Sequence, residues 1–201
     1  NSMQIRKSLA YGEFINALYE TADSCKELKS LFSNNAIKKD AHVEALLRVI
    51  VMSDVFYRGY KFEKSGINNI LNSYCEDNKN KLISKNYIKD LSSAIKMMYS
   101  IFGKSKNIFR KVEKINEDEL GFVGNLNVSI LEAMLGVIIE KKISLTDIDP
   151  EVIKNQYLNT MYSILEKSFK REEENPFSIS TGTLQSIRKR FEICEGILGY
   201  R

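Results

Sequence analysis

Proline is rare in this chain: it accounts for two of the 201 residues, and glycine for ten. Both residues interrupt helices, so their scarcity favours long helices over many short strands. The segment 40–57 shows the helical pattern most clearly, because its apolar residues recur at three- and four-residue steps on one stripe: Val43, Leu46, Leu47, Ile50, Val51 and Val55. We therefore expect an all-α fold, a single irregular multi-helix bundle of about seven to nine helices in one domain over residues 1–201.

Capping signals place several of the expected helices. Beside 40–57, apolar periodicity predicts helices over 2–22 with a break near Gly12, 24–32, 66–78, 85–102, 128–141 and about 150–170. Asp149 followed by Pro150 is a strong start signal for the last of these. Ser180 or Thr181 is the expected N-cap of a final helix that ends before Gly199.

The longest apolar stretch, 126–139, predicts the central buried helix rather than a membrane span. It contains Asn127, Ser129 and Glu132, so it cannot cross a bilayer. If Glu132 is enclosed by the core, its carboxylate needs a partner. With 43% hydrophobic and 28% charged residues, the chain is neither disordered nor a membrane protein, and its start lacks a secretion signal pattern. We expect a cytoplasmic protein.

The residues that usually carry chemistry are sparse. Three cysteines at positions 25, 75 and 194 form neither a disulfide framework nor a zinc motif, and burial as small hydrophobes is the expected role. His42 is the one histidine, which removes two-histidine metal sites and suggests a capping or surface role. The segment 121–124 lacks the lysine and the spacing of a phosphate-binding loop. We assign no catalytic, cofactor-binding or metal residue.

Two basic clusters are the candidate nucleic-acid contacts. The segment 104–114 carries five basic residues against Glu113, and a second cluster lies on the final helix; the candidates are Lys104, Lys106, Arg110, Lys111, Lys114, Arg188, Lys189 and Arg190. Contacts to phosphate oxygens dominate the affinity for DNA without base recognition. Phe109 would anchor the first cluster to the core. The alternative is an ordinary solvated surface, because a net charge of +4 is mild for a dedicated DNA binder.

A set of spaced residues resembles a known family. The set comprises Gln4-Ile5-Arg6, Gly12-Glu13-Phe14, Glu44 to Arg48, Leu71-Asn72, Phe102-Gly103, Phe109-Arg110, Asn127 with Glu132, and the helix start from Thr181 to Arg190. Its order and spacing resemble the helical second half of the GmrSD-type restriction proteins, a ParB/sulfiredoxin-like nuclease family. The match runs from Gln4 to about Leu198 and is strongest in the first 80 residues.

The resemblance implies a role in bacterial defence. Similar proteins cut phage DNA that carries modified bases or backbone, and their first half bears an Asp-Gly-Gln-Gln-Arg motif linked to nucleotide binding and cleavage. No stretch here matches that motif, and one histidine cannot supply the His-Asn-His nuclease domain of many members. The resemblance therefore implies a fragment of a larger protein, whose partner is a catalytic ParB/sulfiredoxin-like domain of the same or a companion protein.

Four charged residues are candidates for structural ion pairs. Arg6 and Arg48 match the family and lie beside apolar stripes, where charges are commonly paired. Glu13 and Glu44 are the expected partners, and Glu44 stands four residues before Arg48 on one helix.

Three hypotheses for the function follow. The first is a non-catalytic helical accessory domain of a DNA-restriction protein, which supports the nuclease half and contacts the phosphates of double-stranded DNA. The second is a protein-interaction or oligomerisation module without nucleic-acid binding. The third is a small enzyme whose site the sequence does not reveal. Salt-sensitive DNA binding separates the first two, and a deep pocket with convergent carboxylates would support the third.

Overall fold

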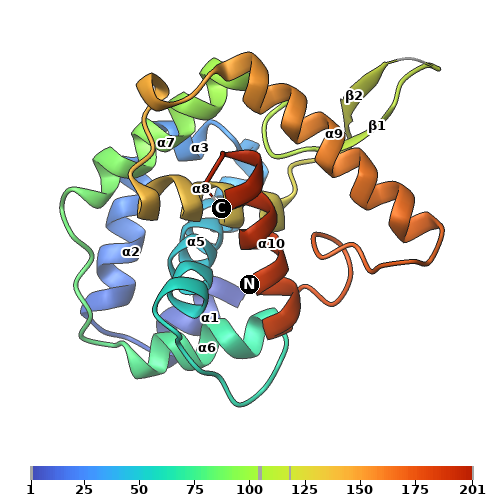
Figure 1. The fold of residues 1–201 in the computed structure, drawn as a ribbon. Coiled ribbons are helices and arrows are strands. Elements are labelled where there is room, and N and C mark those ends of the chain that lie inside the picture. The colour runs from blue at the N-terminus through green and yellow to red at the C-terminus, as the bar shows by residue number, and fades with distance from the viewer. Residues whose placement is uncertain (1, 104–105, 118, 201) are drawn as a thin grey trace.

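The computed structural model of this protein describes residues 2–103, 106–117 and 119–200. It is built mainly from helices, with one small hairpin on its edge (Figure 1). The helices in these ranges are α1 (Ser2–Leu9), α2 (Glu13–Ser24), α3 (Lys26–Lys29), α4 (Asn34–Ile37), α5 (Ala41–Tyr57), α6 (Ile67–Asp77), α7 (Tyr87–Phe102), α8 (Val128–Lys141), the 3-10 turn η1 (Leu145–Asp147), α9 (Pro150–Phe169) and α10 (Leu184–Ile197). The all-α prediction is confirmed, although the described ranges hold ten α-helices because α3 and α4 are single turns.

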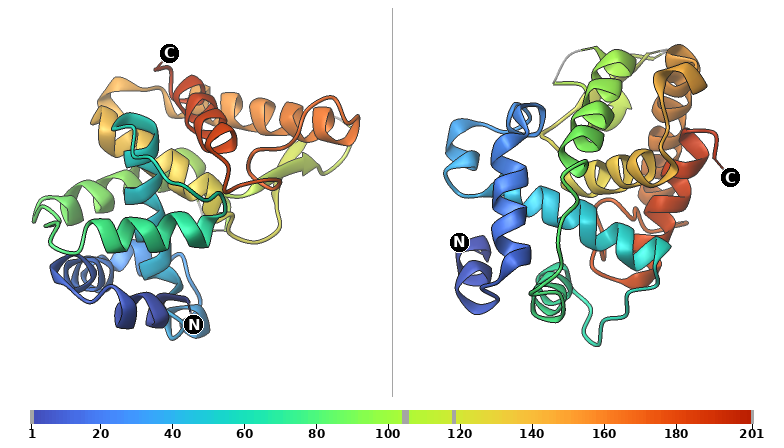
Figure 2. Two further views of the ribbon diagram at one scale, coloured as in Figure 1. Left: turned by 90° about the horizontal axis from the view of Figure 1, so that it is seen from below. Right: turned by 90° about the vertical axis from the view of Figure 1, so that its left-hand side faces the viewer.

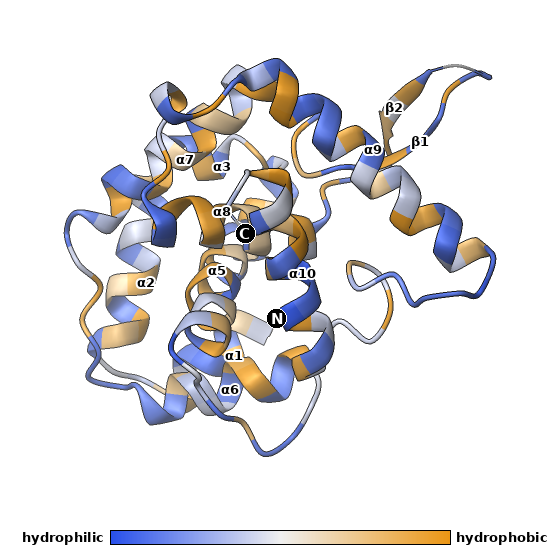
Figure 3. Ribbon diagram, viewed as in Figure 1, coloured by the Kyte–Doolittle hydropathy of each residue, from blue (hydrophilic) through white to orange (hydrophobic). Residues whose placement is uncertain are grey.

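Helices α5 and α8 form the centre of the molecule. Both are buried on nearly all sides, and α10 packs across them (Figure 2). Gly136 on α8 allows α5 and α10 to pack closely against α8. A Cβ atom at this position would stand 2.6 Å from the Ser53 hydroxyl oxygen on α5 and 2.8 Å from the Phe191 ring on α10. The predicted central helix is thus confirmed. Figure 3 shows α8 largely hydrophobic, whereas hydrophobic and hydrophilic stretches alternate along α9, which has an exposed face.

The break between α1 and α2 lies at Gly12, as the sequence predicts. The Phe14 amide donates a hydrogen bond to the Lys79 carbonyl at 3.0 Å, and a Cβ atom on Gly12 would stand 2.5 Å from the same oxygen. Glycine is needed here because the loop before α7 passes so closely.

The segment after Gly103 contains a hairpin that the sequence analysis did not predict. Strands β1 (Lys111–Lys114) and β2 (Leu120–Val123) are antiparallel, with Lys111 opposite Val123 and Lys114 opposite Leu120. The hairpin lies over α9 (Figure 1), and the Phe122 ring packs at the edge of the Phe102 ring with centroids 5.6 Å apart. The expected loop is therefore a strand pair that depends on α9 for its stability.

The helix start signals are partly confirmed. The Asp149 carboxylate accepts from the amides of Glu151 at 3.0 Å and Val152 at 3.3 Å. The predicted cap of α10 is wrong, because Thr183 takes that position and accepts from the Ser186 amide at 3.2 Å. The preceding residues stay non-helical because Gly182 lies directly against the backbone of Gly66. No helix in the described ranges is both long and apolar enough to cross a membrane.

Candidate functional site

A buried ion network joins the three central helices. Glu132 on α8 is 0% exposed, and its two oxygens accept from Arg190 on α10 at 2.5 Å and from the Nε of Arg48 on α5 at 2.6 Å. Arg48 also donates to the Ser129 hydroxyl at 3.1 Å. An enclosed Glu132 was expected to need a partner, and in the structure it has two, Arg48 and Arg190. Because two guanidinium groups share one carboxylate, the buried network carries a net positive charge.

The prediction that Arg190 contacts DNA phosphates is wrong. Its side chain is fully buried, and beside Glu132 it donates to the carbonyl oxygens of Pro176 at 3.0 Å and Thr181 at 2.9 Å. These bonds hold the segment 176–183, a series of turns and bends, against the core before α10 begins. Arg190 is therefore a structural residue, and it has no surface from which to reach a nucleic acid.

Arg6 forms a second buried network, which attaches α1 to the body. The side chain is 3% exposed and donates to Glu44 at 3.0 Å, to Asn68 at 2.8 Å and to Asn72 at 2.9 Å. Glu44 is thereby engaged with Arg6, so the predicted pair of Glu44 with Arg48 is wrong. Glu13 is exposed and belongs to neither network, which corrects its assignment as an ion-pair partner.

The basic side chains of the hairpin region do not form one continuous strip. Lys106, Lys111 and Lys114 are exposed, whereas Arg110 is half-buried and donates to the Gly124 carbonyl at 3.0 Å. Successive side chains of a strand point to opposite faces. Lys114 lies over the Tyr162 ring of α9, 5.8 Å from its centroid. Lys104 lies outside the described residues.

Acidic residues reduce the net positive charge of the hairpin region. Glu113 is exposed on β1, and Glu117 and Glu119 are exposed in the turn that follows. Phe109 is fully buried and anchors the segment to the core, as predicted. Lys106 and Lys111 are the side chains of this cluster that remain free to approach a phosphate without competing for a protein partner in the described structure.

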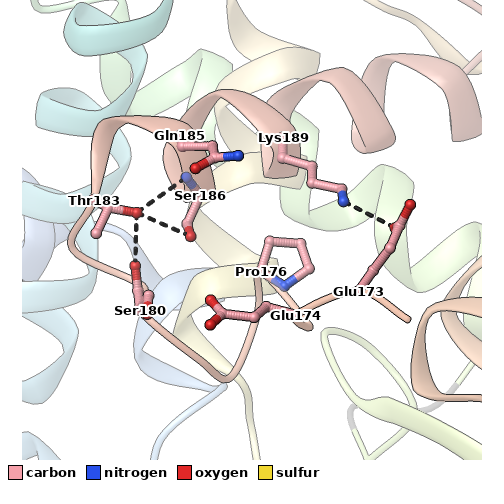
Figure 4. A pocket seen from close by; sticks show the side chains of 8 residues that line it. All are labelled: Glu173, Glu174, Pro176, Ser180, Thr183, Gln185, Ser186 and Lys189. Carbon is pink, nitrogen blue, oxygen red and sulfur yellow. Dashed lines mark hydrogen bonds and ion pairs between the residues drawn. The ribbon is translucent and has the colours of Figure 1, made fainter. Parts of the chain in front are cut away.

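Lys189 of the second basic cluster lines a polar depression of about 420 Å³ at the start of α10 (Figure 4). Lys189 donates to Glu173 at 2.9 Å, and this hydrogen bond lowers the pKa of the Glu173 carboxyl. The Thr183 hydroxyl bonds the Ser180 carbonyl and the Ser186 hydroxyl, each at 3.0 Å, so it stabilises the helix start. Glu174 adds another negative charge, and the depression as a whole disfavours phosphate. Arg188 remains exposed.

The cysteines and the histidine are structural. All three cysteines are buried, as predicted, and burial raises the pKa of the Cys75 thiol to about 12. The expected surface role of His42 is wrong: the ring is 2% exposed, and its Nε2 lies 2.9 Å from the Asp23 carboxylate. Within the described ranges, no group of three histidine, cysteine, aspartate or glutamate side chains converges as metal ligands.

One short segment exposes large apolar side chains. Ile5 and Leu9 on α1 are 58% and 66% exposed, and Tyr11, just after the helix, is 71% exposed. Ile5 and Leu9 stand four residues apart, so they share one side of the helix. We call these three residues the α1 face. Large apolar side chains that are exposed together in this way are typical of a surface that contacts another molecule.

Comparison of the chain with protein-family models, with curated proteins and with solved structures finds no match in any of the three. The similarity to GmrSD-type proteins therefore rests on the spaced residues alone and stays a prediction.

Proposed function

We propose that this chain is the non-catalytic helical part of a bacterial DNA-restriction protein of the GmrSD type, and that the α1 face docks it onto the catalytic ParB/sulfiredoxin-like half. The observation that carries the proposal is the contrast between the two sides of α1. One side is fixed by the buried Arg6 and by Met3, which is 1% exposed, while the other leaves Ile5 and Leu9 in solvent. A helix held rigidly in this way loses little conformational entropy when a partner covers it.

The docking role predicts that the α1 face adds nothing to the stability of the isolated chain. We expect Ile5→Ser combined with Leu9→Ser to change the free energy of unfolding by less than about 0.5 kcal/mol, since exposed side chains away from special features contribute little. The matched control is Met3→Ala on the buried side of α1, which should cost about 2–5 kcal/mol. Urea denaturation followed by circular dichroism measures both. A loss in the double variant as large as that in the control would mean that the face belongs to the fold.

In the proposed complex, the exposed cations Lys106, Lys111 and Arg188 contact DNA phosphates. We expect Lys106→Glu with Lys111→Glu to weaken duplex binding and to reduce the slope of log affinity against log salt by about 1.8, because each lost phosphate contact removes about 0.9. Fluorescence anisotropy over a salt series measures this slope. The matched control, Lys61→Glu with Lys64→Glu, makes the same charge change in the exposed loop after α5, at the opposite end of the molecule from the hairpin (Figure 1).

The second candidate function is an interaction module that does not bind nucleic acid. The acidic residues that accompany the hairpin lysines favour it, because they offset the positive charge that would attract DNA. The same salt series separates the two functions. If the wild-type chain fails to bind duplex DNA at low salt, or if the two charge-reversal pairs weaken binding equally, the DNA contact is excluded and the docking role alone remains.

A further inference from the structure

A small pocket lies where the loop before α7 crosses α2, α5 and α8. Its volume is about 160 Å³, and it combines an apolar wall with charged and hydroxyl groups. Phe14, Ile50 and Ile83 contribute to the wall, while Asp54, Lys81 and Tyr87 are among the polar residues. The pocket is separate from the α1 face and from both basic clusters, so nothing in the proposed function accounts for it.

The carboxylates of this pocket already have their hydrogen bonds. Asp54 is 7% exposed; one of its oxygens accepts from Arg58 at 2.8 Å, and the other accepts from Lys81 at 2.6 Å and from the Tyr74 hydroxyl. Both oxygens of Glu140 accept from Arg58, each at 2.9 Å. The two anions are thus balanced by the two cations, and their lone pairs are largely occupied. A ligand that brings mainly hydrogen-bond donors would find few acceptors here.

In contrast, three side chains of the pocket have hydrogen-bond donors that no protein acceptor in the described ranges uses. The Lys81 ammonium has three N–H groups and gives two of them to Asp54 and the Tyr74 hydroxyl, which leaves one. The Tyr87 hydroxyl forms no hydrogen bond within the described part of the chain, and burial raises its pKa, so its proton is retained. Ser84 is exposed at the rim of the pocket; its oxygen accepts from the Asn86 amide at 3.3 Å, and its O–H has no protein acceptor in the described ranges.

A pocket with occupied acceptors and unused donors favours a ligand that is rich in hydrogen-bond acceptors. A carboxylate offers about four lone-pair positions and forms a charge-assisted bond with an ammonium group. Tyr87 is the first residue of α7, and the amino end of a helix also favours negative charge. The volume corresponds to roughly five waters in liquid packing, which limits the ligand to a few heavy atoms. The apolar wall favours a short hydrocarbon body.

We propose that this pocket binds a small carboxylate with a short apolar body, held by the free donors of Lys81, Ser84 and Tyr87 while the body packs on Ile50 and Ile83. Because the three ion pairs around Asp54 and Glu140 are already formed, the ligand binds without breaking them. The proposal does not depend on the docking or DNA-binding roles.

Isobutyrate is the probe that tests the site. We expect saturable NMR shift changes at residues 81–87 of the full chain, with at least tenfold weaker binding of isobutyramide, which has the same shape without the charge. Inorganic phosphate, which lacks an apolar body, should also bind at least tenfold more weakly. Equal or tighter binding of either comparator, or no saturation by isobutyrate, would overturn the proposal.

Conservative variants locate the binding to the pocket. We expect Tyr87→Phe to weaken isobutyrate binding at least fivefold and Ser84→Ala at least twofold, since each removes one donor and leaves the Asp54 network in place. The matched control is Tyr162→Phe on α9, which removes an exposed tyrosine hydroxyl that bonds Glu166 at 3.1 Å and should leave binding unchanged. Unchanged binding in both pocket variants would overturn the assignment.

Discussion

Replacing Glu132 by glutamine is expected to lower the free energy of unfolding by about 3–5 kcal/mol. The substitution keeps the shape of the side chain but removes the negative charge that Arg48 and Arg190 share in a fully buried position. The fully buried Arg190 and the partly exposed Arg48 are then left without a counterion. Urea denaturation followed by circular dichroism measures the loss.

The control for this prediction is Glu192→Gln, the same substitution on the exposed side of α10. It should change stability by less than about 0.5 kcal/mol, as surface substitutions usually do. A loss below about 1 kcal/mol for Glu132→Gln would contradict this prediction, because it would mean that Arg190 and Arg48 do not depend on the carboxylate.

A second large loss, about 3 kcal/mol, is expected for Gly136→Val. The first added carbon alone would stand 2.6 Å from the Ser53 hydroxyl oxygen and 2.8 Å from the Phe191 ring, so α5, α8 and α10 must move apart. Overpacking of a core costs about 1–3 kcal/mol and occasionally more, and valine adds two further methyl groups to the clash. Thermal or urea unfolding measures the change.

Two further variants isolate the steric cause. Asn155→Val places the same side chain on the exposed face of α9 and should be nearly neutral. In the Gly136→Ala background, Ser53→Ala removes the atom nearest to the new methyl group and should restore part of the lost stability, which a double-mutant cycle detects. If Gly136→Val were no more destabilising than Asn155→Val, the close approach of α5 to α8 would be wrong.

The positions of the helices could be predicted because they depend on local signals. The apolar stripe of α5, the break at Gly12 and the cap at Asp149 each follow from residues within a few positions of one another. The hairpin gave no such signal. Each strand has four residues, only Val112 of β1 is buried, and the pairing depends on packing against α9, which follows much later in the chain.

The exposure and the ion-pair partners of the charged residues could be predicted only in part, because both depend on the geometry of the folded helices. Arg188, Lys189 and Arg190 are adjacent in sequence, but successive residues of a helix point about 100° apart. Arg188 is therefore exposed, Lys189 is half-buried against Glu173, and Arg190 is enclosed. The position of Glu132 in the apolar stretch 126–139 predicted that its carboxylate would need a partner. Sequence spacing could not identify those partners, which lie 84 and 58 positions away on other helices.

Isothermal titration calorimetry tests the proposed docking through the α1 face most directly. The proposed binding partner is a ParB/sulfiredoxin-like catalytic domain of the same or a companion protein. We expect saturable binding by the wild-type chain and at least tenfold weaker binding when Ile5→Ser and Leu9→Ser are combined. The control pair, Lys61→Glu with Lys64→Glu, should bind as the wild type does. Binding that the double serine variant leaves unchanged, or no binding by the wild-type chain, would contradict the claim.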